Sequence, residues 1–150
     1  MPQSLSRMLA HLVFSTKHRE PWITPAVREE LHSYLGGVLK NSDCPPIRVG
    51  GVADHVHLFF GMSRTLSAAQ VVEKVKVASS KWIKEQGPEF SAFHWQSGYG
   101  IFSVSQSEAG RVEQYVATQE DHHRVMSFQE EYRQFLARHG VEYDERYVWD

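Results

Sequence analysis

Two histidines in a short hydrophobic segment, residues 54–60, constrain what this chain can fold into more than any other feature. The segment is rich in aromatic and β-branched residues and is bounded by glycines, which predicts a β-strand. Because side chains alternate across a strand, His55 and His57 share one face, roughly 7 Å apart at the backbone, while Val56 and Leu58 point to the other. Two imidazoles at this spacing can bind one metal ion, although two half-exposed strand histidines would give the same pattern.

The composition is that of an ordinary globular protein. The chain has 150 residues, of which 41% are hydrophobic and 23% are charged, so we expect a single domain over residues 1–150. No stretch is apolar for long enough to cross a membrane, and the N-terminus lacks the basic start and apolar run of a signal peptide. The single cysteine, Cys44, excludes an internal disulfide and a cysteine-rich metal site. It is compatible with a reducing cytoplasm, where we expect the protein to act.

Charge is distributed unevenly along the chain, whose formal net charge is −2. Residues 64–84 carry five basic side chains and one acidic side chain, whereas residues 108–150 carry ten acids and five bases. A local basic face could therefore meet a phosphate backbone while the whole chain stays acidic. A solvated helix face explains the same lysines equally well, so charge alone does not identify a nucleic-acid binder.

The periodicity of hydrophobic residues predicts alternating strands and helices. Strands are predicted at 9–16, 47–53, 54–60 and 101–105, and helices at 25–40, 68–83, 105–122 and 128–139. Pro25 after Thr24 is typical of a helix start, and Ser105 with Glu108 has the form of a capping box. The order β-α-β-β-α-β predicts an α+β, ferredoxin-like fold, in which an antiparallel sheet carries both crossover helices on one face and C-terminal helices follow. The other face, which carries the histidines, is expected to be open for a site or a partner.

A tyrosine and a glutamine stand four residues apart in the helix predicted at 105–122. Tyr115 and Gln119 therefore lie on one helical face, one turn apart. A tyrosine beside a cation is a candidate nucleophile for phosphoryl transfer, because the cation helps a phenol with a usual pKa of about 10 to ionise. The Gln119 amide oxygen could complete a two-histidine site, and mixed nitrogen and oxygen ligands suit Mg²⁺ or Mn²⁺. Packing at the boundary of an amphipathic helix is the alternative role for Tyr115.

These residues resemble a known family. The segment 54–57 looks like the HUH motif, two histidines around a hydrophobic residue, and Tyr115 with Gln119 looks like the tyrosine helix of insertion-sequence-200-like (TnpA-type) single-tyrosine transposases. Similar blocks follow in the family's order at 11–19, 74–82, 95–104, 119–123 and 128–143. The resemblance therefore covers nearly the whole chain.

The resemblance implies a homodimeric transposase that acts on single-stranded DNA at hairpins near the ends of a mobile element. In such enzymes a tyrosine attacks a phosphodiester, which forms a 5′-phosphotyrosine and frees a 3′-hydroxyl for later rejoining. The resemblance implies that Tyr115 is the nucleophile and that His55, His57 and Gln119 bind the divalent metal, Mg²⁺ or Mn²⁺. In the family the tyrosine helix often meets the histidines of the other subunit, so composite sites and sites within one chain both stay open.

Six basic residues are candidates for contacts with DNA phosphates. They are Lys17, Arg19, Lys74, Lys76, Lys81 and Arg111. Trp95 is expected in the core rather than stacked on a base, and His122 and His123 are expected to be exposed or structural. No general base is evident from the sequence.

Three other interpretations stay open. A domesticated relative would nick repeat hairpins with the same motifs, and genomic context would separate it from an active transposase. A catalytically inactive DNA-binding relative would not need the histidines, the tyrosine and the glutamine. A metal-dependent phosphohydrolase, in which water attacks, ranks last because the chain lacks a second His-x-Thr or His-x-Ser motif.

Overall fold

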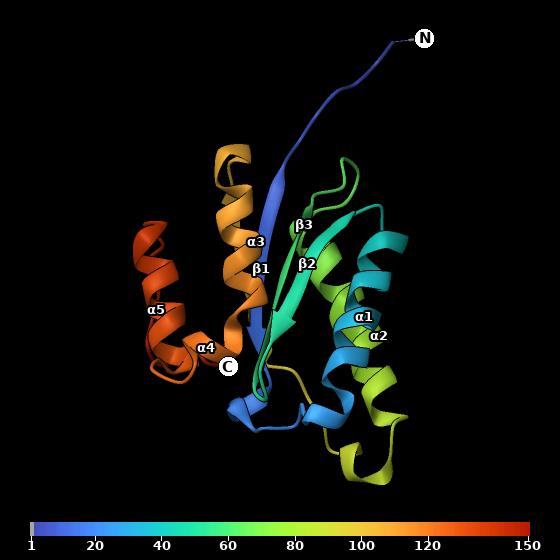
Figure 1. Cartoon of the computed structure of the whole chain (residues 1–150), viewed down its shortest axis with the longest axis vertical. Helices are drawn as coiled ribbons and strands as arrows, with labels where there is room; N and C mark the ends of the chain where they lie inside the picture. Colours follow the sequence, from blue (N-terminus) through green and yellow to red (C-terminus); the bar gives the residue numbers. More distant parts are fainter. Residues whose placement is uncertain (1) are drawn as a thin grey trace.

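Figure 1 shows the computed structural model, which describes residues 2–150 of the chain. Strands β1 (Leu9–Ser15), β2 (Pro46–Gly51), β3 (His55–Gly61) and β4 (Gly100–Val104) form one antiparallel sheet in the order β2-β3-β1-β4. Helices α1 (Pro25–Asn41) and α2 (Ala68–Lys84) follow β1 and β3, and α3 (Ala109–Ala117), α4 (Gln119–His122) and α5 (Phe128–Arg138) follow β4. Short 3-10 turns occupy η1 (Lys17–Arg19), η2 (Pro88–Phe90) and η3 (Gln106–Glu108). The predicted α+β, ferredoxin-like fold is confirmed.

One face of the sheet packs against α1 and α2 (Figure 1). Leu12 and Phe14 of β1 and Val56, Leu58 and Phe60 of β3 point to these helices, and all five are fully buried. The helices contribute leucines from α1 and mainly valines from α2 to the same core. Complete burial of one such side chain stabilises a fold by about 1.5–3 kcal/mol, so this layer holds the sheet together.

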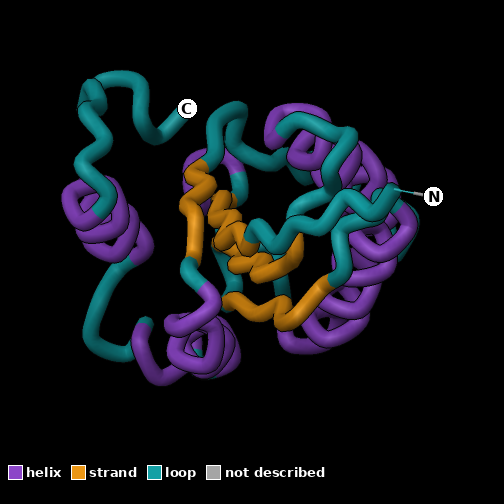
Figure 2. Tube along the Cα trace, turned by 90° about the horizontal axis from the view of Figure 1, so that it is seen from above, coloured by secondary structure: helices purple, strands orange, loops and turns teal. Residues whose placement is uncertain are grey.

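The opposite face of the sheet is covered by the chain's own C-terminal helices, which corrects the expectation of an open face. α3 packs along β2 and β3, and α5 lies beside α3 and packs toward β1 and β4 (Figure 2). Val13 of β1 and Phe102 of β4 pack with Phe135 of α5. Gly50 lets α3 approach β2, because a Cβ at this position would lie 2.1 Å from the carbonyl oxygen of Val116. The apolar stripes of α3 and α5 need a surface to pack on, and this face of the sheet provides it.

The segment predicted as one helix from 105 to 122 is divided into three pieces. The predicted capping box is wrong, because the Ser105 hydroxyl lies 3.1 Å from the Ser107 hydroxyl and a 3-10 turn precedes α3. α3 ends before Thr118, whose φ is −111° and whose hydroxyl donates to the Gln114 carbonyl. A side-chain bond of this kind competes with the backbone pattern of a helix and bends it. Gln119 therefore begins a new helix, α4, instead of continuing α3.

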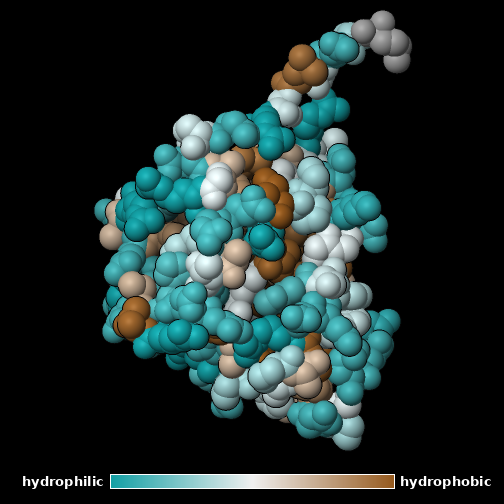
Figure 3. All heavy atoms as spheres, in the orientation of Figure 1, coloured by the Kyte–Doolittle hydropathy of each residue, from teal (hydrophilic) through white to brown (hydrophobic). Residues whose placement is uncertain are grey.

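The surface seen in the orientation of Figure 1 is mostly hydrophilic, and hydrophobic side chains are confined to small areas (Figure 3). Among the helices of residues 2–150, none is long and apolar enough to cross a membrane.

Candidate metal and tyrosine site

The two strand histidines point to the same face of β3, as the alternation predicts. Both His55 and His57 are fully buried under the C-terminal helices, so they are not half-exposed surface residues. Their Nε2 atoms converge on the carboxylate of Glu131 from α5. His57 Nε2 lies 2.9 Å from Glu131 Oε1, and His55 Nε2 lies 3.5 Å from the same oxygen.

A third histidine completes a cluster around this carboxylate. His123 Nε2 lies 3.2 Å from Glu131 Oε2, and the ligand atoms of His55, His57, His123 and Glu131 all lie within 4.8 Å of one another. His123 is not exposed, which was one of the two roles expected for it: the turn after α4 brings its ring to the cluster, and its side chain is 10% exposed. Within residues 2–150, these four side chains form the group of potential ligands whose geometry could hold a metal ion.

Sequence reasoning missed Glu131, although a signal for it exists. Glu131 stands three residues after Phe128 and four before Phe135, on the buried side of α5, and it is 1% exposed. A carboxylate on the buried face of an amphipathic helix needs a charged or hydrogen-bonding partner, since burial without one is costly. That pattern points to a polar site under α5.

Tyr115 and Gln119 lie beside the histidine cluster, within the same chain. The Tyr115 hydroxyl donates to Glu131 Oε2. The Gln119 amide oxygen lies 3.0 Å from His123 Nε2 and 3.4 Å from His55 Nε2, and its amide nitrogen donates to the Tyr115 carbonyl. The break before α4 makes this possible, because it sets the Gln119 side chain between α3 and the histidines.

The outer nitrogens of the strand histidines are held by two further residues. The His55 ring donates from Nδ1 to Asp54 Oδ1 at 2.7 Å. His57 Nδ1 lies 2.8 Å from Nε2 of His11, a residue of β1 that is 3% exposed. Partners of this kind fix the orientation of a ligand ring and decide which nitrogen carries its proton. Both Nε2 atoms thus face the centre of the cluster.

The pKa values of these groups are shifted in different directions. Burial lowers the pKa of His55, but hydrogen bonds and charges from Asp54 and Glu131 outweigh it and raise that pKa to about 9. Burial dominates at His57 and lowers its pKa to about 4. Burial opposes ionisation of Glu131, but hydrogen bonds from the three histidines hold its pKa well below the usual range. The metal-free cluster therefore contains a His55 cation beside a Glu131 carboxylate, with His57 neutral.

The tyrosine is not ionised in this environment. Burial and the neighbouring Glu131 charge both raise the pKa of the Tyr115 phenol well above its usual value. An added positive charge at the cluster would act in the opposite direction, because it offsets the carboxylate. Tyr115 is thus a neutral phenol whose ionisation depends on what the histidines bind.

The chemistry of the donor set fits a divalent cation. Three imidazole nitrogens, a carboxylate and the Gln119 amide oxygen face one another at the base of α3 and α5. Imidazole-rich sites suit transition metals, whereas Mg²⁺ prefers oxygen ligands and water.

Two of the six predicted DNA-contact residues line cavities at the cluster or beside it. Arg111 and Tyr115 of α3 line a cavity of about 640 Å³ between β4, α3 and α5, together with His11. Arg19 lines a second cavity, of about 460 Å³, that His123 also lines. Lys17 is exposed in the same turn as Arg19.

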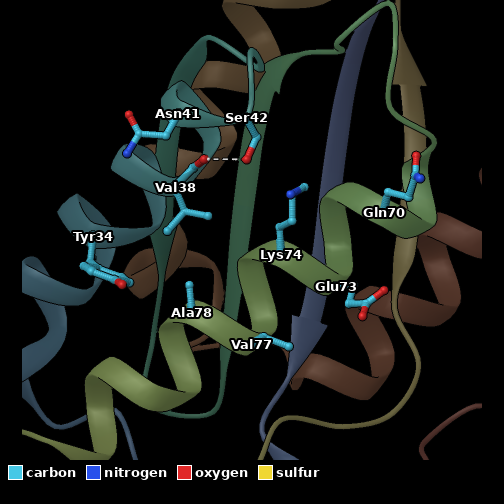
Figure 4. A pocket seen from close by; sticks show the side chains of 9 residues that line it. All are labelled: Tyr34, Val38, Asn41, Ser42, Gln70, Glu73, Lys74, Val77 and Ala78. Atoms are coloured by element: carbon cyan, nitrogen blue, oxygen red, sulfur yellow. Dashed lines mark hydrogen bonds between the residues drawn. The ribbon is translucent and has the colours of Figure 1, made fainter.

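The three predicted lysines of α2 lie on the other side of the sheet from the histidines. Lys74 lines a cavity of about 670 Å³ between α1 and α2 (Figure 4). Lys81 is exposed and lines a shallower one beside Trp95. Lys76 is tied inside the chain, because its Nζ donates to the carbonyls of residues 96, 97 and 98 at 2.7, 3.2 and 2.7 Å. Burial lowers the pKa of Lys76 to about 8. Trp95 is in the core, as predicted.

Comparison with known proteins gives a family and a fold. The family model described as "Transposase IS200 like" matches residues 4–119. Curated proteins gave no match. Among solved structures, an inferred transposase from Deinococcus radiodurans R1 is 20% identical, with a TM-score of 0.62 over 77% of this chain and 95% of that one. A REP-associated tyrosine transposase bound to a REP hairpin is 8% identical, with a TM-score of 0.56 over 77% of this chain and 68% of that one. At these identities the two structures establish a shared fold.

Proposed function

Because this chain belongs to the IS200-like transposase family, we propose that it cleaves and rejoins single-stranded DNA with Tyr115 as the nucleophile. The observation that carries this proposal is the convergence of the Tyr115 hydroxyl and three histidines on the Glu131 carboxylate. A nucleophile and a cation-binding group are thereby held within one hydrogen bond of each other. A protein that only binds DNA has no need for that arrangement.

We propose that His55, His57 and Gln119 hold the divalent cation, and we add His123 and Glu131 to that set. Such a cation would supply positive charge that stabilises a phosphate oxygen and lowers the pKa of a neighbouring hydroxyl. Asp54 and His11 orient the two strand histidines from outside. Gln119 also fixes the backbone of Tyr115, because it donates to that residue's carbonyl.

The proposed chemical step is a transesterification. The Tyr115 oxygen forms a bond to phosphorus while the bond from phosphorus to O3′ breaks, which leaves a 5′-phosphotyrosine and a free 3′-hydroxyl. The phenolic proton is lost to water, and O3′ takes up a proton from water. The bond energy is conserved in the phosphotyrosine, so a 3′-hydroxyl can rejoin the strand without another energy source.

The substrate we propose is single-stranded DNA with a hairpin near the cleaved position. The REP-associated structure supports this choice, because its protein is bound to a REP hairpin. Homodimerisation, which the resemblance implies, is part of the proposal. Since Tyr115 meets the histidines of its own chain, each subunit would contain a complete site rather than share one. Hairpin nicking by a domesticated relative would use the same residues.

The test is a denaturing gel of the protein with 5′- or 3′-labelled single-stranded hairpins from the flanks of its own gene, with and without Mn²⁺ or Mg²⁺. We expect a metal-dependent covalent protein–DNA band in the wild type and none in Tyr115→Phe, which should still bind the hairpin in a native gel. Tyr99→Phe is the matched control, because Tyr99 packs against the α1–α2 core. Retained adduct in Tyr115→Phe would remove this tyrosine from the mechanism, and hydrolysed DNA without an adduct would favour the phosphohydrolase.

A further inference from the structure

A buried pair of imidazoles, His11 and His57, extends the cluster toward β1. His11 lies on β1 and His57 on β3, where Val13 is the direct cross-strand neighbour of His57. His11 is two residues from Val13 on the same face, so it is a diagonal neighbour of His57. The rings lie 5.0 Å apart between centroids, and His11 Nε2 is 2.8 Å from His57 Nδ1.

The pair leaves no freedom in the orientation of the His57 ring. One ring nitrogen faces His11 at 2.8 Å and the other faces Glu131 at 2.9 Å. The edge of Phe135 packs on His11 with 5.1 Å between ring centroids and an interplanar angle of 88°. His11 is itself 3% exposed, so in the folded chain its imidazole, and not solvent, occupies the position beside His57 Nδ1.

We propose that His11 is a positioning residue that accepts the Nδ1 proton of His57 when a cation is bound, which leaves the Nε2 lone pair of His57 facing the cation site. The proposal rests on the proposed function in one respect, namely that His57 is a metal ligand. A ligating nitrogen must offer a lone pair, so the ring proton of His57 has to stay on Nδ1. There it is donated to His11 Nε2, and His11 carries its own proton on Nδ1.

The choice of histidine rather than a carboxylate at this position has a physical reason. Without a cation, His57 donates from Nε2 to Glu131, and its Nδ1 then accepts a proton from His11 Nε2. In the cation-bound and the cation-free arrangement alike, each of the two rings carries one proton and is uncharged. A neutral imidazole at position 11 can therefore act as acceptor in the first and as donor in the second. Asp54, which holds His55, can only accept and would leave His57 unable to adopt the metal-free arrangement.

The second ring nitrogen of His11, Nδ1, can exchange its proton with solvent. His11 lines the cavity of about 640 Å³ between β4, α3 and α5, which is open to solvent along the exposed Arg111, Arg138 and His139. Water in this cavity can exchange a proton with His11 Nδ1 when the pair changes arrangement. A hydrophobic residue at position 11 would fill the same space but would leave His57 Nδ1 buried without a partner.

The test measures metal binding by the DNA-free protein, so it does not depend on cleavage. Mn²⁺ dissociation constants are determined by calorimetry or EPR for the wild type, His11→Phe, His11→Gln and the control His139→Phe. His139 lines the same cavity and stacks on Phe102 with 4.6 Å between centroids, away from the proposed ligands. We expect roughly 10- to 100-fold weaker binding in His11→Phe, as for other outer-shell partners. Partial rescue is expected in His11→Gln, whose amide can accept or donate, and no change in His139→Phe.

A second measurement uses the wild type alone and covers the case in which His11→Phe does not fold. In ¹⁵N NMR spectra of the Zn²⁺-loaded protein, His57 should be protonated at Nδ1 and His11 should accept at Nε2. Protonation of His57 at Nε2 under these conditions would overturn the inference. So would an Mn²⁺ affinity of His11→Phe equal to that of the wild type, or an affinity of His11→Gln no higher than that of His11→Phe. If the wild type bound no divalent cation, the metal part of the proposed function would fall as well. If no DNA adduct formed but His11→Phe still weakened Mn²⁺ binding, only the proposed function would be overturned.

Discussion

The two faces of the sheet differ in what they bury. The face toward α1 and α2 is covered by aliphatic and aromatic side chains, with Leu12, Leu58 and Phe60 fully buried. The face toward α3 and α5 buries His11, His55, His57 and Glu131 nearly as completely. The first face gains free energy from removing apolar surface from water, whereas the second must compensate each desolvated polar group with a hydrogen bond or charge. The polar groups of the candidate site thus lie on one side of the strands, opposite the larger apolar core.

This difference is sharpest at two consecutive residues of β3. His57 and Leu58 are both fully buried, and their side chains leave the strand in opposite directions. Substitution of each by alanine should therefore separate loss of function from loss of stability, which neighbouring residues of one strand rarely allow.

The largest effect is expected for His57→Ala. This variant should lose the metal-dependent covalent adduct by about 100- to 1,000-fold, on the order of the loss seen when a group that stabilises a transition state is removed. Adduct yield on a denaturing gel, normalised to the fraction folded by circular dichroism, measures it. An unchanged metal requirement would argue against His57 as a ligand.

The next effect concerns Leu58→Ala, on the apolar face. The deletion leaves a cavity between β3 and the two long helices, so the free energy of unfolding should fall by about 2–5 kcal/mol in urea titrations. The Mn²⁺ affinity of the molecules that remain folded should not change, because the Leu58 side chain packs in the core on the opposite face from the cluster. A parallel loss of affinity in folded Leu58→Ala would show that the two faces are not independent.

The smallest effect is a pH dependence that has opposite signs for metal binding and for stability. The pKa of His55 is about 9 in the metal-free fold, above the usual 6.5, so a cation must displace a proton from it below pH 9. Mn²⁺ affinity should therefore rise up to about tenfold per pH unit from 6.5 to 9 and level off above 9.

The stability of the metal-free protein should change in the other direction over this range. Because the folded pKa of His55 is raised, its contribution is complete below pH 6.5 and is lost as the pH rises through 9. The loss should be on the order of 1–3 kcal/mol in unfolding titrations. His55→Gln should abolish both slopes, and a pH-independent affinity in the wild type would contradict the assignment.

The contrast between the faces also explains what the sequence could predict. The strand at 54–60, the side to which each of its residues points and the α+β fold all follow from alternation and periodicity. Tyr115 and Gln119 were singled out by helical spacing and by the family resemblance, and the structure sets both beside the histidines. These inferences depend on local order along one element, which a sequence displays directly.

The residues that were missed depend on pairing between distant elements. His11 meets His57 only because β1 pairs with β3 in one particular register, which alternation alone does not specify. Glu131 and His123 reach the cluster only because α3 ends at Thr118 and α5 folds back over the sheet. The incorrect capping box at Ser105 has a similar origin, since the competing contact with Ser107 is not visible in the motif.

The position of Tyr115 beside the histidines of its own chain has a kinetic consequence. If one polypeptide carries every group needed for strand cleavage, the rate of adduct formation is first order in protein and the activity per molecule does not change on dilution. Each rejoining consumes one phosphotyrosine, so an exchange of strands between two cleaved sites would require two of them, hence two chains, and that step would become slower as the protein is diluted. Cutting and joining by this fold would then separate by concentration alone, and the amount of protein in the cell would decide whether a nicked strand is released or transferred.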